Sequence, residues 1–281
     1  MKLKLFAILG ILLLAGSGCN KNLPKNTIKN ISDNKSASEI HTIIDKNLWY
    51  QPKPGVSWQW QLLGEINAQY EVDLYDLDLI ETKQEIIDTL RSRGTKVICY
   101  FSAGSLENYR DDAGDFPADA VGKTLEGWPD EKWLDVSKYY KFANVIEKRL
   151  DLAVQKKCDG VEPDNVDGYQ NDTGFNLTYA DQLNYNKWLA SEAHQRNLSI
   201  ALKNDLEQVK DLVAYFDFSV NEQCFQYKEC DLLLPFIRQN KAVLGVEYEL
   251  DTGDFCEEAN SLNFSWLKMK YELDGSRISC K

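Results

Sequence analysis

The feature that most constrains the fold is a repeated alternation of short apolar runs with amphipathic stretches, which begins near residue 49. The apolar runs predict strands at residues 58–63, 72–79, 96–101, 160–161, 198–202, 216–220, 242–248 and 264–269. The amphipathic stretches predict helices at 82–93, with Thr82 as N-cap, and at 138–157, 181–196, 206–215 and 232–239. Residues 103–137 are predicted to be a long loop.

Strands that alternate with helices are joined by parallel crossovers. Seven or eight such units over this length favour an α/β fold with a single domain, the (β/α)8 TIM barrel, which typically uses about 250 residues. A doubly wound sheet is less favoured because no glycine-rich phosphate loop follows the first strand.

The first residues are typical of a targeting segment. Lys2 and Lys4 precede an apolar run at 5–15, small residues follow, and Cys19 comes next. This pattern resembles a bacterial lipoprotein signal in which Cys19 would be lipidated; an ordinary secretory signal is the alternative. We therefore expect a signal peptide at 1–19, a flexible tether at 20–48 and the folded domain at 49–281. The protein would be exported, either anchored to a membrane only through its lipid or secreted.

The chain carries 32 basic and 44 acidic residues, a formal net charge of -12. Such a surface argues against nucleic acid as a partner, because nucleic acid selects basic surfaces. The charge favours solubility or attracts a cationic substrate. We expect a monomer.

Seven cysteines fit an exported protein, because six remain once Cys19 is set aside, an even number suited to disulfides. We expect one disulfide between Cys224 and Cys230 and another between Cys256 and Cys280. Cys99 and Cys158 lie in apolar runs and are predicted to be buried free thiols.

Polar side chains gather where the predicted strands end, most densely in residues 158–169 (CDGVEPDNVDGY). In a barrel the C-terminal strand ends share one mouth, so these side chains should meet there. The set is Asp76, Asp78, Tyr100, Ser102, Glu162, Asp164, Asn165, Lys203, Asn204, Asp205, Asn221, Glu222, Gln223, Glu247 and Tyr248.

The small number of histidines narrows the types of reaction that the site could catalyse. The chain has two histidines, His41 and His194, which leaves no Ser-His-Asp arrangement and no histidine-rich metal site. We expect no cofactor and no metal, although carboxylates alone can hold Mg²⁺ or Ca²⁺. A pair of carboxylates suits glycoside hydrolysis. Aromatic side chains that would pack on sugar rings fall near the mouth, namely Trp58, Trp60, Tyr75, Tyr100, Trp128, Trp133 and Tyr169.

Several motifs in consistent order make the chain similar to glycoside-hydrolase family 114. They are WQWQL at 58–62, YDLD at 75–78, VICYFSAGS at 97–105, WLD at 133–135, DGVEPDNVDGY at 159–169, LKND at 202–205 and NEQCF at 221–225. The resemblance covers about residues 57–250. It implies a (β/α)8 barrel, endo-α-1,4-polygalactosaminidase-like activity and catalytic carboxylates at Asp164 and Glu222. The implied substrate is an α-1,4-linked galactosamine polymer, which is cationic when it is not acetylated.

The hypothesis for roles is that Asp164 stays ionised as nucleophile or stabiliser while Glu222 acts as general acid and base, with Asp167 as runner-up acid. Residues expected to bind substrate are Asp76, Asp78, Tyr100, Ser102, Trp133, Glu162, Asn165, Lys203, Asn204 and Glu247. Carboxyl groups about 5 Å apart predict retention of configuration, and about 6.5–9.5 Å inversion. Two alternatives stay open: a carbohydrate-binding lipoprotein without hydrolysis, and a hydrolase of a different glycan.

Overall fold

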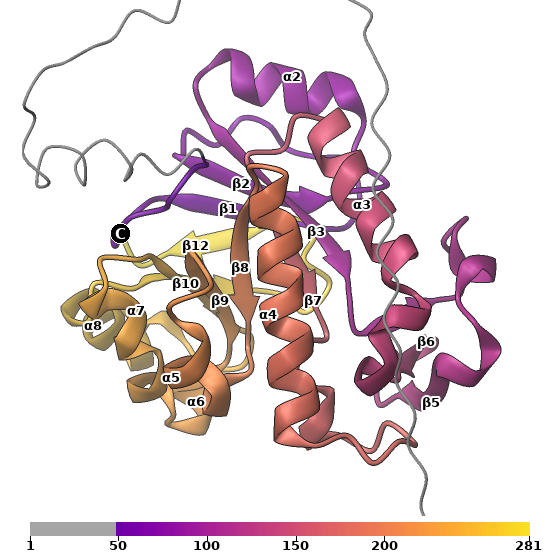
Figure 1. Cartoon of the computed structure of the whole chain (residues 1–281). Coiled ribbons are helices and arrows are strands. Elements are labelled where there is room, and N and C mark those ends of the chain that lie inside the picture. Colours follow the sequence, from indigo (N-terminus) through magenta and orange to yellow (C-terminus); the bar gives the residue numbers. More distant parts are fainter. Residues whose placement is uncertain (1–48) are drawn as a thin grey trace, which may run out of the picture. The chain divides into compact units, whose positions relative to one another are not determined.

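The computed structural model of the chain describes residues 49–281, so the predicted signal peptide, the lipidation site at Cys19 and the predicted tether lie outside the described residues. Within that range the main feature is a curled nine-stranded sheet with the order β1-β2-β3-β7-β8-β9-β10-β11-β12. Its first eight strands pair in parallel, and β12 joins β11 antiparallel. The fold is an α/β barrel of the TIM class (Figure 1).

The strands are short, and most of their residues are buried, as expected of parallel strands covered on both faces. Their bounds are β1 Trp58–Gln61, β2 Leu74–Asp78, β3 Lys96–Ser102, β7 Gly160–Asp164, β8 Ser199–Lys203, β9 Phe218–Glu222, β10 Val243–Glu247, β11 Ser265–Met269 and β12 Arg277–Ser279. The predicted strands are thus present, whereas β12 was not among them.

Helices cover the outside of the sheet, and Figure 1 shows α3 and α4 running beside strands β7 and β8. The α-helices are α2 Gln84–Ser92, α3 Ala143–Gln155, α4 Tyr179–Gln195, α5 Val209–Leu212, α6 Cys224–Tyr227, α7 Leu234–Arg238 and α8 Thr252–Ser261. Short 3-10 turns are η1 Ala113–Asp115, η2 Ala118–Ala120, η3 Val136–Lys141, η4 Gly168–Gln170, η5 Leu206–Gln208 and η6 Cys230–Leu233. In the described residues no helix has both the length and the apolar character needed to cross a bilayer.

Two predicted helices differ from the structure at their N-termini. Lys83, not Thr82, is the N-cap of α2, and the Thr82 hydroxyl is buried without a hydrogen-bond partner in the described residues. The helix predicted at 138–157 is divided, because Lys138 has φ -122° and ψ 34° inside η3 before α3 begins.

The predicted loop at 103–137 instead contains a second sheet. Strands β4 Ser105–Glu107, β5 Val121–Leu125 and β6 Trp128–Leu134 pair antiparallel in the order β4-β6-β5. Figure 1 shows β5 and β6 projecting to one side of the barrel. This small sheet places Trp128 and Trp133 on a strand rather than in a loop.

The barrel closes where β1 meets the segment between β11 and β12. The backbone amides of Leu62 and Leu63 both donate to the carbonyl of Leu273, at 3.0 and 3.3 Å. The indole of Trp58 donates to the carbonyl of Ser265 at 3.0 Å. The core lies in two parts: a cluster inside the barrel that includes Trp58 and Trp60, and a larger one between sheet and helices.

Three disulfides are formed. The predicted pairs Cys224–Cys230 and Cys256–Cys280 are confirmed. The prediction of free thiols at Cys99 and Cys158 is wrong, because these residues form the third disulfide with their Cα atoms 6.1 Å apart. Cys158 lies just before β7, which pairs with β3 so that Cys99 is opposite Val161, and this register brings the two sulfurs together.

Candidate active site

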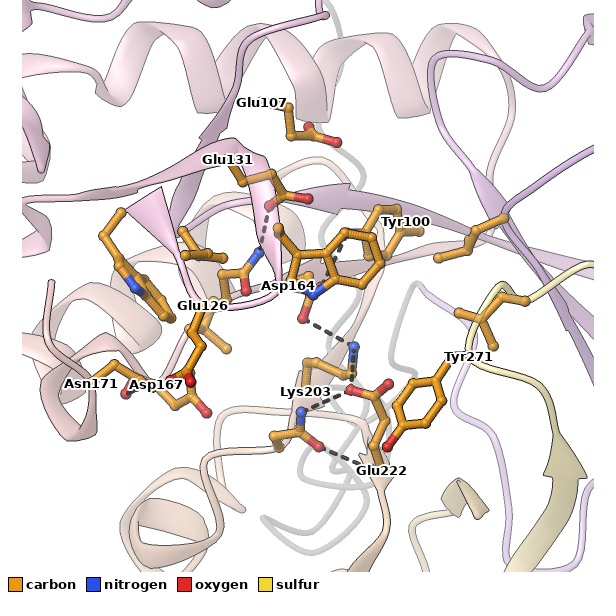
Figure 2. Close-up of a pocket in the computed structure, with 18 of the residues that line it drawn as sticks. Tyr100, Glu107, Glu126, Glu131, Asp164, Asp167, Asn171, Lys203, Glu222 and Tyr271 are labelled. Carbon is orange, nitrogen blue, oxygen red and sulfur yellow. Dashed lines mark hydrogen bonds and ion pairs between the residues drawn. The ribbon is translucent and has the colours of Figure 1, made fainter. Parts of the chain in front are cut away.

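A cleft of about 860 Å³ lies at the C-terminal ends of the barrel strands. Residues from the barrel form one side, and β5 and β6 of the small sheet form the other (Figure 2). Predicted site residues that line this cleft are Asp78, Tyr100, Trp133, Asp164, Asn165, Lys203, Asn204 and Glu222.

Lys203 is the centre of the site. Its Nζ lies 3.0 Å from Asp164 Oδ1, 3.3 Å from Glu222 Oε2 and 3.4 Å from Glu162 Oε1. Burial alone would lower the pKa of Lys203, but the charges of Asp164, Glu222 and Glu162 outweigh it and hold that pKa well above its usual range. A permanent ammonium group therefore links two carboxylates that come from β7 and β9.

Neutral donors fix the other contacts of these two carboxylates. The Tyr100 hydroxyl donates to Asp164 Oδ2 at 3.0 Å, and the Tyr248 hydroxyl donates to Glu222 Oε1 at 2.5 Å. Burial, followed by the charge of the adjacent carboxylate, raises the pKa of both tyrosines, so each remains a hydrogen-bond donor. Side-chain exposures of 19% for Asp164 and 27% for Glu222 leave both accessible from the cleft, whereas Lys203 is only 3% exposed.

A shared backbone turn follows each of these three strands. Asp164, Lys203 and Glu222 are the last residues of β7, β8 and β9. The next residue has a positive φ in every case: 60° at Asn165, 49° at Asn204 and 65° at Gln223. Asparagine tolerates this left-handed conformation better than most residues. The turn redirects the chain at the mouth of the barrel immediately after the functional side chain.

Asn204 uses its turn to position Glu222. Its Nδ2 donates to Glu222 Oε2 at 3.1 Å, while its Oδ1 accepts from the Glu222 backbone amide at 3.0 Å. The side-chain amide therefore holds both ends of Glu222. This explains why Asn204 belongs to the site although it comes from the neighbouring strand.

Below Lys203, two buried carboxyl groups occupy the barrel interior. Asp76 and Glu162 are both 0% exposed, and neither accepts a hydrogen bond from the described residues. Burial raises the pKa of Asp76 to about 7 and, together with the charge of Asp76, raises that of Glu162 well above its usual range. The ring of Trp60 lies beside them, with its centroid 4.9 Å from Lys203 Nζ.

Four predicted substrate-binding residues do not reach the cleft surface, namely Asp76, Ser102, Glu162 and Glu247. Ser102 belongs to a hydrogen-bonded group, in which its Oγ lies 2.6 Å from Ser105 Oγ. Glu247 is 0% exposed, and its Oε1 accepts from the Phe225 amide at 3.0 Å. Asp78 lines the cleft, but Arg110 forms an ion pair with it at 2.5 Å.

The small sheet supplies residues that sequence reasoning missed. Glu131 on β6 and Arg110 after β4 both line the cleft. Arg110 also binds Glu107 at 2.8 Å, so it joins the small sheet to the end of β2 through Asp78. On β6 the buried Glu131 and Trp133 alternate with the exposed Asp130 and Lys132, as in a strand with one covered face, and this short alternation was the available signal. Trp128, at the start of β6, is 58% exposed.

Asp167, the predicted runner-up acid, also lines the cleft. Burial, and then the charge of Asp164, raises its pKa to about 6. In residues 49–281, no group of three or more His, Cys, Asp or Glu side chains is arranged to hold a metal ion.

Comparison with known proteins places these features in a family. The family model described as glycoside-hydrolase family GH114 matches residues 40–281. The crystal structure of Aspergillus fumigatus Ega3 in complex with galactosamine is 40% identical, with 82% of this chain and 97% of that chain covered and a TM-score of 0.79. No curated protein matches the chain.

More distant structures share the fold. The glycoside hydrolase domain of PelA from Pseudomonas aeruginosa is 14% identical, with 79% of this chain and 98% of that chain covered and a TM-score of 0.63. Eubacterium rectale Amy13B is 10% identical, with 84% of this chain and 69% of that chain covered and a TM-score of 0.52. Because the family model matches most of the chain and Ega3 is 40% identical to it, this protein belongs to glycoside-hydrolase family GH114 and is a glycoside hydrolase.

Proposed function

We propose that this enzyme cleaves an α-1,4-linked, galactosamine-containing polysaccharide, with Asp164 as nucleophile and Glu222 as general acid and base. The similar Ega3 structure is a complex with galactosamine, which supports an amino sugar as the substrate unit. A net charge of -12 is compatible with a cationic polymer, because opposite charge raises the local substrate concentration.

One observation carries the proposal: Asp164 and Glu222, 58 positions apart in the sequence, reach the same Lys203 ammonium from one cleft. A glycosidase needs two carboxyl groups that flank one glycosidic bond. A protein that only binds sugars has no use for two carboxylates held at a common point by tyrosine, asparagine and lysine donors.

The reaction follows from these positions. A carboxylate oxygen of Asp164 forms a bond to the anomeric carbon while the bond from that carbon to the glycosidic oxygen breaks, and Glu222 gives its proton to the leaving oxygen. Glu222 then takes a proton from water, whose oxygen attacks the anomeric carbon and releases Asp164.

The spacing of the carboxylates supports retention of the anomeric configuration. Because Asp164 Oδ1 and Glu222 Oε2 both contact Lys203 Nζ, these two oxygens are at most about 6.3 Å apart. Inverting enzymes hold their carboxyl groups about 6.5–9.5 Å apart to leave room for a water molecule. Proton NMR of the first product formed should therefore show the α-anomer before mutarotation.

The test measures new reducing ends from deacetylated and N-acetylated α-1,4-galactosamine polymers. We expect the wild type to cleave, Asp164→Asn to lose nearly all turnover, and Glu222→Gln to lose about 10²- to 10⁴-fold, the usual contribution of a general acid. Asp167→Asn tests the runner-up acid, and Asp111→Asn, an exposed carboxylate outside the cleft, is the matched control.

Three outcomes separate the alternatives. Turnover retained by Asp164→Asn or Glu222→Gln removes that residue from the mechanism. Binding of either polymer without any new reducing ends indicates a binding protein. Cleavage of another α-linked glycan, with neither galactosamine polymer attacked, indicates a different substrate.

We also propose that the chain is exported, with residues 1–19 as a lipoprotein signal and 20–48 as a tether to the domain. The three disulfides support an oxidising compartment, because cytosolic thiols are usually kept reduced. Expression with labelled palmitate should label the wild type and not a Cys19→Ala variant. Equal labelling would contradict lipidation at Cys19.

A further inference from the structure

The cleft contains far more negative than positive side chains. Cationic groups in its lining are Arg110, Lys123 and Lys203, whereas the carboxylates are Asp78, Glu107, Glu126, Glu131, Asp164, Asp167, Asp172, Glu222 and Glu272. Lysine or arginine nitrogens lie within 4.0 Å of five of these, Asp78, Glu107, Asp164, Asp172 and Glu222.

Glu131 differs from the other carboxylates of this lining. In the described part of the chain it has no ion-pair partner, although it is only 7% exposed. Glu126 and Glu272 are also unpaired but exposed, and Asp167 is partly exposed. Burying a carboxylate without a cation costs free energy, so a cationic ligand from outside the chain would stabilise this group.

One oxygen of Glu131 is fixed and the other is available. Oε2 accepts from Ser105 Oγ at 2.6 Å and from Asn165 Nδ2 at 3.4 Å. Oε1 accepts no hydrogen bond from residues 49–281. It is also not fully enclosed, so a ligand in the cleft can reach it. Figure 2 shows Glu131 on the same cleft as Asp164, on the side of the small sheet.

The neighbouring strand increases the cost of this arrangement. Glu107 on β4 is directly opposite Glu131 on β6, and like charges in that position destabilise a sheet. Arg110 and Arg149 neutralise Glu107, at 2.8 and 3.5 Å. Glu131 receives no such compensation from the described residues. The strand pair therefore carries one carboxylate that arginines neutralise, Glu107, and one open carboxylate, Glu131, meaning one without a cationic partner in the described residues.

Trp133 provides an apolar surface beside the open carboxylate. It lies two residues from Glu131 on β6, so strand alternation puts both side chains on one face, and both line the cleft. Trp133 is 8% exposed, so the part of its indole that reaches the cleft offers an apolar contact rather than a full stacking face. A sugar ring in contact with it would present its polar substituents to the carboxylate beside it.

We propose that Glu131 and Trp133 form a subsite for one galactosamine unit, in which Glu131 Oε1 binds the 2-ammonium group and Trp133 contacts the ring. This inference rests on the proposed function and goes beyond it, because it assigns the discrimination between free and N-acetylated amines to a residue outside the Lys203 cluster. An acetamido group carries no charge and adds bulk, so it leaves Glu131 without its cation.

The electrostatics agree with this assignment. Burial, partly offset by the hydrogen bond from Ser105 and increased by the charges of Glu107 and Asp164, raises the pKa of Glu131 to about 7. An ammonium at hydrogen-bond distance favours the ionised carboxylate and forms a charge-assisted hydrogen bond.

The experiment compares Glu131→Gln with Asp130→Asn in the full chain. Asp130 is the adjacent carboxylate on β6, is exposed and does not line the cleft, so the control changes the same charge on the same strand. Steady-state kinetics use fully deacetylated and partly N-acetylated galactosamine oligomers. Calorimetric binding of the deacetylated oligomer gives a second readout that does not depend on turnover.

We expect Glu131→Gln to raise KM for the deacetylated oligomer and weaken its binding by roughly 10- to 100-fold, the range for a lost hydrogen bond to a charged group. kcat should stay within about threefold, and preference for the deacetylated oligomer should fall by a similar factor. Asp130→Asn should stay within about twofold of the wild type in every measurement.

Equal KM and affinity for Glu131→Gln and Asp130→Asn overturn the subsite. A lower kcat with unchanged KM also overturns it, because Glu131 would then act through Asn165 on Asp164. If Glu131→Gln shows no cooperative melting, Glu131→Asp replaces it; this variant retains the charge but shortens the side chain, and wild-type KM in it overturns the subsite. Wild-type binding without cleavage rejects only the proposed function, whereas no binding by the wild type rejects both.

Discussion

Gly104 packs so closely against Asn165 that a Cβ on the glycine would lie 1.6 Å from the Asn165 carbonyl oxygen. The amides of Ala103 and Gly104 donate to the Asp164 carbonyl at 2.9 and 3.0 Å, and the Leu134 amide donates to the Gly104 carbonyl at 2.9 Å. Gly104 therefore joins the end of β3, the end of β7 and the small sheet at one point. This contact fixes the backbone that carries Asp164.

We predict that Gly104→Ala displaces the end of β7 and lowers kcat/KM by about 10²-fold, because a misplacement of about 1 Å in a catalytic group has an effect of that size. The overpacked contact should also lower the free energy of unfolding by about 1–3 kcal/mol. Steady-state kinetics and urea unfolding measure the two effects.

Gly114→Ala is the matched control, because a Cβ there meets nothing within 4 Å and the backbone is not in the left-handed region. Wild-type kinetics in Gly104→Ala would show that the loop after β3 can move without disturbing Asp164.

The barrel could be predicted because its determinants are local. Runs such as 96–101 and 242–248 are continuously apolar, as parallel strands buried on both faces require, and the helices between them are amphipathic. The meeting of Asp164, Lys203 and Glu222 could also be predicted, since they fall at the C-terminal ends of predicted parallel strands, which share one mouth in a barrel.

Contacts that depend on register could not be predicted. Cys99 meets Cys158 only because β3 pairs with β7 in one register, which neither apolar run specifies. The burial of Glu131 depends in the same way on antiparallel pairing within a segment whose glycine, proline and charged residues are typical of a loop. The sequence likewise gave no means to separate Asp78, which lines the cleft, from Asp76, which is enclosed beneath Lys203.

Replacement of Lys203 by methionine should lower the free energy of unfolding far more than replacement of an exposed lysine. Three carboxylates, Asp164, Glu162 and Glu222, lie within 3.4 Å of its Nζ, so the variant leaves them to repel one another. Removing one partner from a buried charge cluster costs roughly 3–5 kcal/mol. Thermal and urea unfolding should show this loss, together with nearly complete loss of cleavage.

Lys210→Met provides the control, because Lys210 is exposed on α5 and forms no ion pair with the described residues. A Lys203→Met protein as stable as this control would mean that the surrounding carboxylates are neutral in the folded state.

The stabilisation that each of the three disulfides contributes should increase with the length of the loop it closes. The sequence separations are 59 for Cys99–Cys158, 24 for Cys256–Cys280 and 6 for Cys224–Cys230. The chain-entropy relation gives about 4, about 3 and about 2 kcal/mol for these loops. Urea unfolding of the three double-alanine variants measures each loss, and a reversed order would show that native packing, rather than loop closure, sets the contribution.

Asp205 should make the folded protein less stable as the pH rises. It is 2% exposed, Asn186 donates to its Oδ2 at 2.8 Å, and its Oδ1 is enclosed without a partner in residues 49–281. Burial, followed by the charge of Asp167, raises the pKa of Asp205 to about 9. In the unfolded chain an aspartate ionises near pH 4, at about 3.9.

Between these two pH values the folded state keeps a proton that the unfolded state has lost, so the free energy of unfolding falls as the pH rises from about 4 to about 9. Asn at position 205 mimics the protonated acid and tolerates the φ of 46° found there. Asp205→Asn should therefore melt near the wild-type temperature at about pH 5 and increasingly above it toward about pH 9. Titrating groups that do not interact with Asp205 are common to both proteins and cancel in the difference, so a melting difference that does not change with pH would mean that Asp205 is ionised in the folded protein throughout this range.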